Sequence, residues 1–376
     1  MVRKSYLRFS ELELRNHYNL CAFCTSRLTS LRIGDQLCID YGSCFICRGL
    51  MNQLDYLDLL IESEAGNNYE FETFCIGISL PHDIFDREDQ VRARHKLRGN
   101  ESIKSQLQNQ LRERFQGRSK KKLSFSEPDL SINVVISQVG KARIFAKSRS
   151  LTFTGRYIKK QRGLPQRQRL CRQCEGEGKK RESRIQCSHH GRSIEGIIAA
   201  ELIRVTKCNF LKFSWVGSED ASSLVSGKGR PFFVRLSDPK LRSLNSHIFI
   251  ETCEVEIILR AGPKSAPQSP IRFITRAKVL VQTTETYEVQ RLEDLSQLNF
   301  SLVKFQDKNR SISKRIYSVE CSTVTNKCFE MKIMVEGGFT IKKFVSGYDN
   351  TVPNVSEIMG TRCETKVFDI SEVILK

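Results

Sequence analysis

The sequence predicts an α+β fold with a large antiparallel component, and three observations support this prediction. Apolar residues make up 39% of the 376-residue chain and aromatic residues 9%, which is enough to build hydrophobic cores. Short β-rich runs dominate the second half, whereas strand and helix patterns are mixed in the first half. The length suits two domains of ordinary size together with a small additional module.

Residues 1–50 contain two pairs of cysteines and are expected to form a module of their own, followed by a mixed strand and helix domain over residues 51–148. A helix in this domain is predicted by apolar residues at i, i+4 spacing, which share one helical face: Ile103, Leu107, Leu111 and Phe115. The strands expected here run from Tyr69 to Ser79, Ile132 to Ile136 and Ala142 to Ala146, the last two around a turn at Gly140-Lys141.

A domain boundary is expected near Ser148, so that residues 149–376 form the last and largest domain. After a basic stretch, the segment Ile194 to Ile203 predicts a helix, and the Pro/Ser-rich segment Gly262 to Pro270 predicts a loop. The β-rich runs of this domain are Phe232–Leu236, Ile248–Leu259, Lys278–Gln282, Ser318–Thr323 and Phe329–Val335.

The chain is strongly basic, with 61 Lys and Arg residues against 42 acids and a formal net charge of +19. Two stretches, Arg92–Lys122 and Gly155–Arg192, carry eighteen of these nineteen charges. A solvated helix face or a basic loop would explain either stretch alone. Two such blocks in an otherwise nearly neutral chain favour a nucleic-acid partner, since neutralising phosphates releases counterions. The candidates for phosphate contacts are Arg92, Arg94, Lys104, Arg112, Lys120, Lys121, Arg156, Lys159 and Lys160.

A basic chain could instead bind anionic lipid. However, no stretch approaches the roughly 18 apolar residues that a membrane span needs. None has the architecture of a signal peptide either. We therefore expect no membrane partner and a cytoplasmic location.

Four of the fourteen cysteines form two pairs, Cys21-x2-Cys24 and Cys44-x2-Cys47, separated by nineteen residues. The chain is too long for a disulfide scaffold, so reduced thiols or metal ligands fit better. Four thiolates at this spacing can close tetrahedrally around zinc, and such a site is structural because no coordination position stays open for water. The alternative is two coincidental pairs of buried cysteines.

A second group consists of Cys171, Cys174, Cys187 and His189, in a polar and basic stretch. These residues could bind a second metal ion, or they could be non-metal cysteines on a flexible loop. Both interpretations remain open.

Several motifs follow one another along the chain in a fixed order. The segment Gly217-Ser218-Glu219-Asp220 precedes Gly229-Arg230-Pro231-Phe232 and then Asp238-Pro239-Lys240. The other members of the series are Asn100–Ser105, Gly155–Tyr157, Arg162–Gln166, Gly338–Lys342 and Val352–Gly360. With the paired CxxC elements, this series resembles the archaeal and eukaryotic tRNA pseudouridine synthase of the T-arm over nearly the whole chain.

The resemblance implies a THUMP-type α/β RNA-binding domain over residues 51–148. Over residues 149–376 it implies a pseudouridine synthase fold with a mixed, largely antiparallel sheet and a deep cleft. It further implies that Asp220 is the catalytic carboxylate and that Arg230 supports the active-site strand. The substrate would be uridine in the T-loop of tRNA, at position 54, 55 or both, with no organic cofactor, and the protein would be a monomer. Without the surrounding motif, Asp220 would be interpreted as an ordinary residue of a solvated loop or helix cap.

The chain also departs from the pattern of this family. Ser218 stands where family members carry Arg, and Ala277 and Thr340 stand at the two family Tyr positions that contact the substrate. Losing an aromatic platform costs about 1–3 kcal/mol of stacking per base. Tyr317 and Phe339 are candidates to compensate.

Three functional hypotheses follow. The first is an active isomerase that depends on Asp220, and the second is a tRNA-binding protein or chaperone of the same fold that has lost catalysis. The third is an unrelated zinc-ribbon protein that binds nucleic acid generally, which would explain the cysteines and the charge but not the ordered series of motifs.

Overall fold

The computed structural model describes residues 17–29, 44–97, 101–168, 192–243, 247–262, 271–307 and 310–376. The chain forms two compact units, which are described separately. Unit 1 comprises Met1–Arg149 and Asp238–Ser243, and unit 2 comprises Ser150–Ser237 and Leu244–Lys376. The second cysteine group lies outside the described residues; it comprises Cys171, Cys174, Cys187 and His189. Residues 263–270 of the loop predicted from Gly262 to Pro270 also lie outside them.

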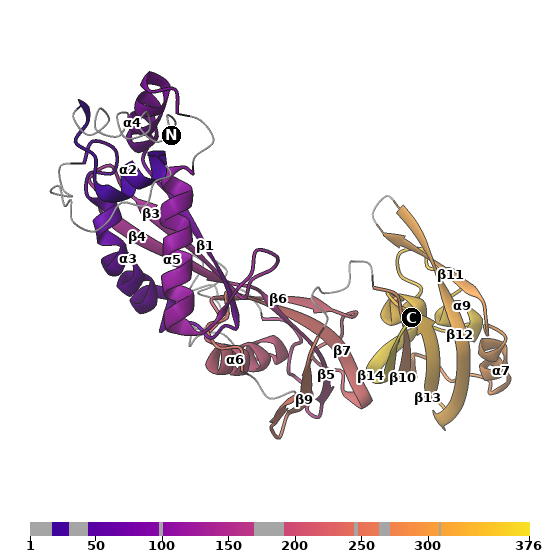
Figure 1. Cartoon of the computed structure of the whole chain (residues 1–376). Helices are drawn as coiled ribbons and strands as arrows, with labels where there is room; N and C mark the ends of the chain where they lie inside the picture. Colours follow the sequence, from indigo (N-terminus) through magenta and orange to yellow (C-terminus); the bar gives the residue numbers. More distant parts are fainter. Residues whose placement is uncertain are drawn as a thin grey trace. The chain divides into compact units, whose positions relative to one another are not determined.

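Unit 1 contains a four-stranded sheet of order β2-β1-β3-β4, in which β1 is parallel to β2 and β3, and β4 is antiparallel to β3. Helices α3 and α5 run along this sheet (Figure 1). The elements of the unit in chain order are α2 (Ala22–Thr29), η2 (Leu50–Gln53), α3 (Leu54–Ile61), η3 (Glu62–Gly66), β1 (Thr73–Ser79), α4 (His82–Arg94), α5 (Ile103–Ser119), β2 (Lys122–Leu123), β3 (Leu130–Ile136) and β4 (Ala142–Ser148).

Local sequence explains helix α5 well. The side chain of Ser102 caps its first turn by accepting a hydrogen bond from the backbone N–H of Ser105, and Lys120 ends it in the left-handed conformation. The predicted apolar face is confirmed, because all four of its residues are fully buried. The strands predicted around Gly140 are confirmed as β3 and β4, whereas β1 begins at Thr73, later than predicted.

The buried apolar residues of unit 1 form one continuous core, from Tyr18 to Ile136. This core includes the four cysteines of the two CxxC pairs and also the inner faces of α5, β1 and β3. The predicted boundary at residue 50 therefore does not coincide with a break between hydrophobic cores, and the domain limits stay a prediction.

Unit 2 contains a mixed sheet of order β11-β12-β13-β10-β14-β7-β5-β9-β8, with β6 paired to β7. Among the described residues of this unit, one pairing is parallel, that of β14 with β7 at Ile370 and Val225, and the other pairings are antiparallel. Its strands are β5 (Leu151–Lys159), β6 (Phe210–Trp215), β7 (Val225–Ser237), β8 (His247–Glu251), β9 (Val255–Ala261), β10 (Phe273–Thr283), β11 (Leu302–Asp307), β12 (Arg310–Thr325), β13 (Cys328–Glu336) and β14 (Cys363–Leu375).

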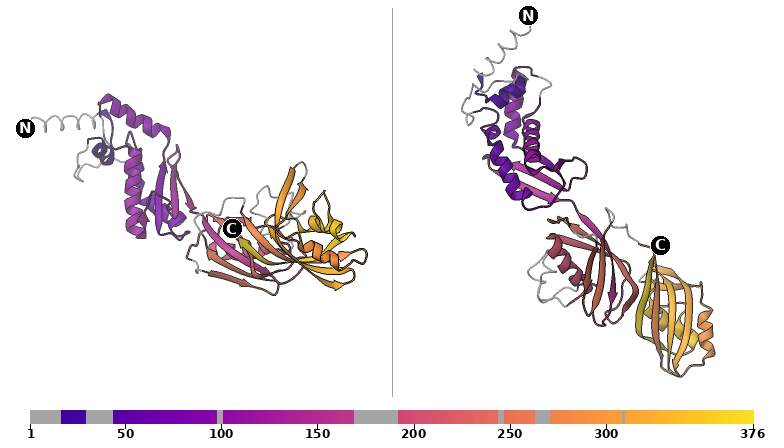
Figure 2. Two further views of the ribbon diagram at one scale, coloured as in Figure 1. Left: turned by 90° about the vertical axis from the view of Figure 1, so that its right-hand side faces the viewer. Right: turned by 60° about the horizontal axis from the view of Figure 1, so that its bottom comes forward.

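Two hydrophobic cores flank the parallel pairing. Helix α6 packs into the core built on β5, β7 and β9, and the remaining helices pack into the core built on β10, β12 and β13 (Figure 2). The helices of the unit are α6 (Ile194–Thr206), α7 (Gln290–Ser296), α8 (Ile341–Ser346) and α9 (Val355–Met359). The helix predicted from Ile194 is thus confirmed. Across the described ranges of both units, no helix combines the length and apolarity needed to cross a bilayer.

The β-rich run predicted from Ile248 to Leu259 forms two strands, β8 and β9, rather than one. The chain reverses between them because the N–H of Thr252 donates to the Val255 carbonyl at 2.8 Å and its hydroxyl accepts from the N–H of Glu254 at 3.2 Å. Side-chain capping of this kind competes with a continuous strand.

Candidate active site and candidate metal centre

A cleft with a cavity of about 270 Å³ lies in unit 2. One wall is the loop 217–220, which follows β6, and the other is the segment 336–342, which runs from the last residue of β13 into the first turn of α8. Its floor comes from the central strands: Phe273 and Thr275 of β10, and Phe368 and Ile370 of β14. The structure therefore brings together segments that are more than a hundred residues apart in the chain.

The carboxylate of Asp220 projects into this cleft with 41% of its side chain exposed. It forms an ion pair with the ammonium group of Lys342, whose side chain is 57% exposed. The sequence contains Lys342 within a motif of the resemblance, but nothing in the spacing indicates that it meets Asp220. Lys342 is therefore a residue of the site that the sequence does not reveal.

Glu219, the neighbour of Asp220, has a fully buried side chain. Its carboxylate lies 3.2 Å from Nε of Arg230 and 3.6 Å from Nζ of Lys159. Burial raises the pKa of Glu219, and the charges of Arg230 and Lys159 oppose that rise. Two adjacent acids thus have different environments, one enclosed between cations and one open to the cleft.

Arg230 is almost wholly buried and also lines the cleft. Its Nη1 donates to the Val216 carbonyl at 2.8 Å, just before Gly217, which has φ of +76°. A Cβ on Gly217 would lie 2.6 Å from Nη1 of Arg230 and 2.8 Å from the Phe273 ring. Glycine is needed there both for its backbone conformation and for space. The contacts of Arg230 hold the backbone before Gly217, and the role that the resemblance implies for Arg230 stays a prediction.

One of the two expected substrate-contact positions, Ala277, is corrected by its burial. Ala277, the expected position of a base-contacting residue, is 3% exposed and packs in the core with Val279 and Val281 rather than lining the cleft. Residues Phe273 and Thr275 of the same strand line the cleft instead. Thr340, the second family Tyr position, does line the cleft.

Lys159, predicted to contact phosphate, has a fully buried side chain. Its ammonium group donates to the backbone carbonyls of Leu164, Asp220 and Ala221 at 2.8 to 3.0 Å. A group enclosed in this way cannot reach an RNA backbone, so this prediction is wrong. Because the stretch around Lys159 is rich in basic residues, its sequence does not indicate that Lys159 is the last residue of strand β5.

The other basic candidates in unit 1 lie at its surface or near it, and several already have a protein partner. Lys104, Arg94 and Lys120 are exposed. Arg112 donates to the Ile76 carbonyl at 3.1 Å. Two more of these candidates form ion pairs, Arg92 with Glu88 at 3.2 Å and Lys121 with Glu72 at 2.8 Å.

In unit 2, Arg156 donates to the Gly229 carbonyl at 2.8 Å, and Lys160 pairs with Glu251 and Glu256 at 3.2 and 3.4 Å. Ion pairs at a surface are weak enough to be exchanged for phosphate. RNA contact by the exposed and partly exposed candidates of both units stays a prediction.

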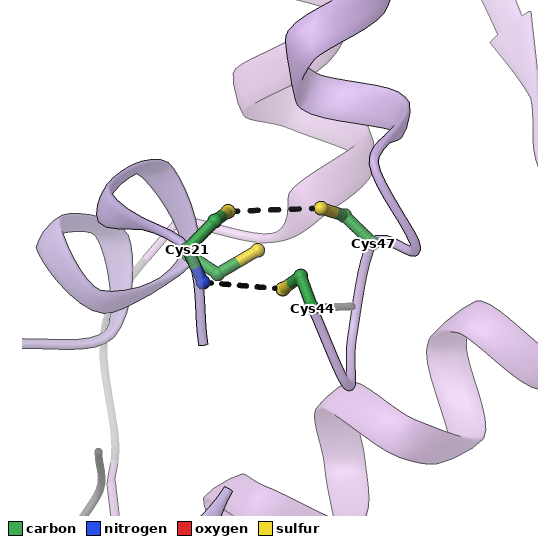
Figure 3. Close-up of side chains that lie close together, drawn as sticks. Cys21, Cys44 and Cys47 are labelled. Atoms are coloured by element: carbon green, nitrogen blue, oxygen red, sulfur yellow. Dashed lines mark hydrogen bonds between the residues drawn. The ribbon is translucent and has the colours of Figure 1, made fainter. Parts of the chain in front are cut away.

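The four predicted metal ligands of unit 1 lie together. The sulfur atoms of Cys21, Cys24, Cys44 and Cys47 are all buried and lie within 4.8 Å of one another. Figure 3 shows the sulfur atoms of Cys21 and Cys47 facing each other, at 3.7 Å. A tetrahedron with zinc–sulfur bonds of about 2.3 Å has sulfur–sulfur edges of about 3.8 Å, so the donor set fits zinc.

The surroundings of the cluster suit thiolates. The backbone N–H of Cys21 donates to Sγ of Cys44 at 3.3 Å, and Nη1 of Arg27 lies 3.6 Å from Sγ of Cys24. Hydrogen bonds from the thiols of Cys21 and Cys24 lower the pKa of Cys44 and Cys47, and the same hydrogen bonds raise the pKa of Cys24 and Cys21. Donors and a cation around the sulfur atoms stabilise the deprotonated form that a metal requires.

Comparison with known proteins finds a family match in each of the two units. Residues 63–134 match the family model described as "Pus10 THUMP domain, archaeal", and residues 153–281 match "Pus10, C-terminal". A protein of Nitrosopumilus maritimus named tRNA pseudouridine synthase Pus10 is 30% identical over 385 residues, covering 97% of each chain. The chain belongs to the Pus10 family. Other relatives with this name are found in Cenarchaeum symbiosum, 30% identical over 89% of this chain and 82% of that one, and in Methanocaldococcus jannaschii, 29% identical over 96% and 81%.

The two Pus10 matches cover one part of the cleft but not its opposite wall or the four cysteines. The C-terminal match includes Glu219, Asp220 and Arg230 but ends before the opposite wall of the cleft, residues 336–342. The THUMP match begins after the four cysteines. Among solved structures, an archaeal box H/ACA Nop10–Cbf5 complex overlaps 58% of this chain and 47% of its own at 8% identity, with a TM-score of 0.31, which is too low to carry an argument.

Proposed function

We propose that this Pus10-family protein is a tRNA pseudouridine synthase that isomerises uridine in the T-loop, at position 54, 55 or both, with Asp220 as its catalytic carboxylate. Three carboxylates line the cleft: Glu219, Asp220 and Glu336. Glu219 is enclosed between two cations, and Glu336 pairs with Lys314 at 3.0 Å and accepts from the N–H of Arg315. Asp220 is partly exposed and its ion-pair partner, Lys342, is itself an exposed side chain, and this accessibility of Asp220 is the observation that carries the proposal.

The reaction detaches uracil from C1′ of the ribose, turns it, and rejoins it through C5. An ionised carboxylate can serve by adding covalently or by removing the proton at C2′, and both routes need it beside the sugar. The ammonium group of Lys342 would orient the carboxylate of Asp220 and keep a positive charge next to the reacting sugar.

The target base has to leave its stack to enter the cleft. Thr340 offers no ring, but the adjacent Phe339 lines the cleft and is held edge-on by Phe305 and Phe344, at ring-centroid distances of 5.0 and 5.3 Å. Phe273 contributes a second ring on the floor. Because the cleft keeps aromatic surface together with its carboxylate, we favour an active isomerase over a binding protein or chaperone that has lost catalysis.

We further propose that the four cysteines of unit 1 hold a structural zinc ion and that the protein acts on the T-arm as a cytoplasmic monomer. Four thiolates would saturate the ion, so zinc would stabilise unit 1 and take no part in the isomerisation. The THUMP match and the basic surface of unit 1 support the choice of tRNA as partner.

The decisive experiment incubates unmodified tRNA transcript with wild-type protein and with the Asp220→Ala variant. Pseudouridine is then mapped by carbodiimide-dependent stops in primer extension. We expect T-loop stops from the wild type and a loss of about a thousandfold in rate for Asp220→Ala. Asp349→Ala, which removes an exposed acid outside the cleft, is the matched control and should keep full activity. Salt-sensitive tRNA binding without stops from the wild type would instead support the binding protein.

A further inference from the structure

The loop that carries Asp220 is held along its main chain by one short segment, residues 159–163, which begins at the last residue of β5. Three consecutive carbonyl groups, those of Asp220, Ala221 and Ser222, each accept a hydrogen bond from this segment. The donors are Nζ of Lys159 to Asp220 and Ala221 at 3.0 and 2.9 Å, the N–H of Gly163 to Ala221 at 2.8 Å, and Nη1 of Arg162 to Ser222 at 2.6 Å.

Lys159 is an unusual residue to find in such a place. Its side chain is fully buried, and burying an ammonium group is costly unless it is paired and hydrogen-bonded. It meets this requirement through three carbonyl acceptors and the carboxylate of Glu219, which is attached to the same loop. The positive charge of Lys159 therefore interacts with the backbone around Asp220, inside the protein, and not with a ligand.

Arg162 holds the next part of the loop from the outside. Besides its bond to Ser222, its guanidinium group forms two hydrogen bonds with the carboxylate of Asp369 on β14, at 2.7 and 2.8 Å. Asp369 in turn accepts from the N–H of Leu224 at 2.9 Å. The loop is thus tied at Ser222 and at Leu224 to a strand that forms the floor of the cleft.

We propose that Lys159 and Arg162 are positioning residues that fix the main chain on the C-terminal side of Asp220, so that its carboxylate stands at a defined place in the cleft. Lys342 holds the carboxylate itself, whereas Lys159 and Arg162 hold the backbone that bears it. A displacement of about 1 Å in a reacting group can cost a hundredfold in rate. The expected change in reaction rate rests on the proposed function, whereas the expected fixing of the backbone beside Asp220 does not.

The test compares the wild type with Arg162→Ala and with the double variant Lys159→Met/Glu219→Gln, which removes both members of the buried pair so that neither charge is left alone. The control is Arg235→Ala, an exposed arginine of the same unit that bonds to Ser150. Three quantities are measured: the single-turnover rate at saturating tRNA, the tRNA dissociation constant, and hydrogen exchange of the peptide spanning residues 219–224.

We expect the rate to fall about tenfold in Arg162→Ala and about a hundredfold in the double variant, with tRNA affinity within twofold of wild type. Exchange of the 219–224 peptide should be faster in both variants and unchanged in Arg235→Ala. A weaker affinity for tRNA at an unchanged rate would make Arg162 an RNA contact and overturn the proposal, as would unchanged exchange. If the double variant fails to fold, Arg162→Ala, which alters a partly exposed side chain, decides alone. A wild type that forms no pseudouridine overturns the proposed function, while the exchange measurement still tests the positioning.

Discussion

The cysteine cluster of unit 1, the candidate metal centre, and the cleft of unit 2 both depend on buried polar groups, yet they are built in opposite ways. The cluster uses four residues of one kind from two short stretches, and their sulfur atoms are all buried and close to one another. The cleft uses residues of different kinds, and its charged groups come from distant parts of the chain. In the first case every group is enclosed, and in the second the enclosed groups surround a carboxylate that stays accessible.

This difference follows from what each site has to do. A structural metal site gains from complete closure, because an open coordination position would admit water. A reacting carboxylate needs access to substrate and a fixed backbone at the same time. Glu219, Arg230 and Lys159 provide the fixed part, and Asp220 with Lys342 provides the accessible part.

The largest effect is expected at the metal centre. Replacing Cys21 and Cys24 together by Ser should abolish zinc binding and unfold unit 1, because these side chains belong to the continuous core of that unit. Structural zinc contributes about 10–16 kcal/mol in zinc-finger peptides, which is comparable with the whole stability of a domain. Metal analysis and near-ultraviolet circular dichroism measure both outcomes. Cys253→Ser, which alters an exposed cysteine, is the control, and equal zinc content in all three proteins would remove the proposed site.

The next effect concerns the buried support of the cleft. Arg230→Met should destabilise the protein by about 3 kcal/mol, because it leaves Glu219 buried with Lys159 as its remaining cation. Adding Glu219→Gln should recover part of that loss, giving a coupling of at least about 1 kcal/mol in a double-mutant cycle. Urea unfolding followed by circular dichroism provides these values. If the two losses simply add, the ion pair does not hold the loop.

Prediction from the sequence succeeded where the evidence was local. The face of α5 follows from i, i+4 spacing, and the cysteine cluster follows from two CxxC pairs. Helix α4 was missed because its buried side includes charged residues, Arg87 and Glu88, so that no apolar stripe marks it. Glu88 pairs with Arg27 at 2.9 Å, a contact that no local pattern predicts.

The cleft was only partly predictable because its contacts, too, join residues that are distant in the sequence. The motif around Asp220 identified the loop, but the pairing with Lys342 depends on how the sheet brings residues 336–342 opposite it. Ala277 lies on the same face of β10 as Thr275 but two residues further along the strand, where that face packs into the hydrophobic core. Placing a residue in the cleft rather than in this core therefore needs an alignment exact to two residues, which the motifs of the sequence do not provide.

A smaller effect is expected from Lys342→Met, and it should separate activity from stability. The pair with Asp220 is largely exposed, so its loss should change the free energy of unfolding by less than about 1 kcal/mol. The rate of isomerisation should nevertheless fall about ten- to a hundredfold, since the carboxylate loses its orienting partner. Single-turnover kinetics and thermal unfolding measure the two quantities. The adjacent Lys343→Met, which removes a pair with Asp349, should leave the rate unchanged, and equal rates in both variants would exclude the role of Lys342.

The smallest effect is a pH dependence that originates at Asp369. Burial raises the pKa of this carboxyl, but hydrogen bonds from Arg162 and from the N–H of Leu224 outweigh burial and lower it overall. A carboxyl whose pKa is lower in the folded than in the unfolded protein stabilises the fold above the unfolded value of about 3.9, and this stabilisation is lost as the pH falls through the folded value. Arg162→Ala should therefore be less stable than wild type at pH 7 by less than about 1 kcal/mol, because the pair is partly exposed.

That difference should stay constant down to about pH 5 and shrink below about pH 4, as Asp369 becomes protonated in both proteins. Urea unfolding of wild type, Arg162→Ala and Arg235→Ala across this range measures it, and Arg235→Ala should show no such change. A difference between wild type and Arg162→Ala that persists unaltered at pH 3 would mean that Arg162 stabilises the loop through the carbonyl of Ser222 alone. In that case the link from the loop to β14 would not depend on the charge of Asp369. The charged groups that support the accessible carboxylate of Asp220 would then be Lys159, Glu219 and Arg230 alone.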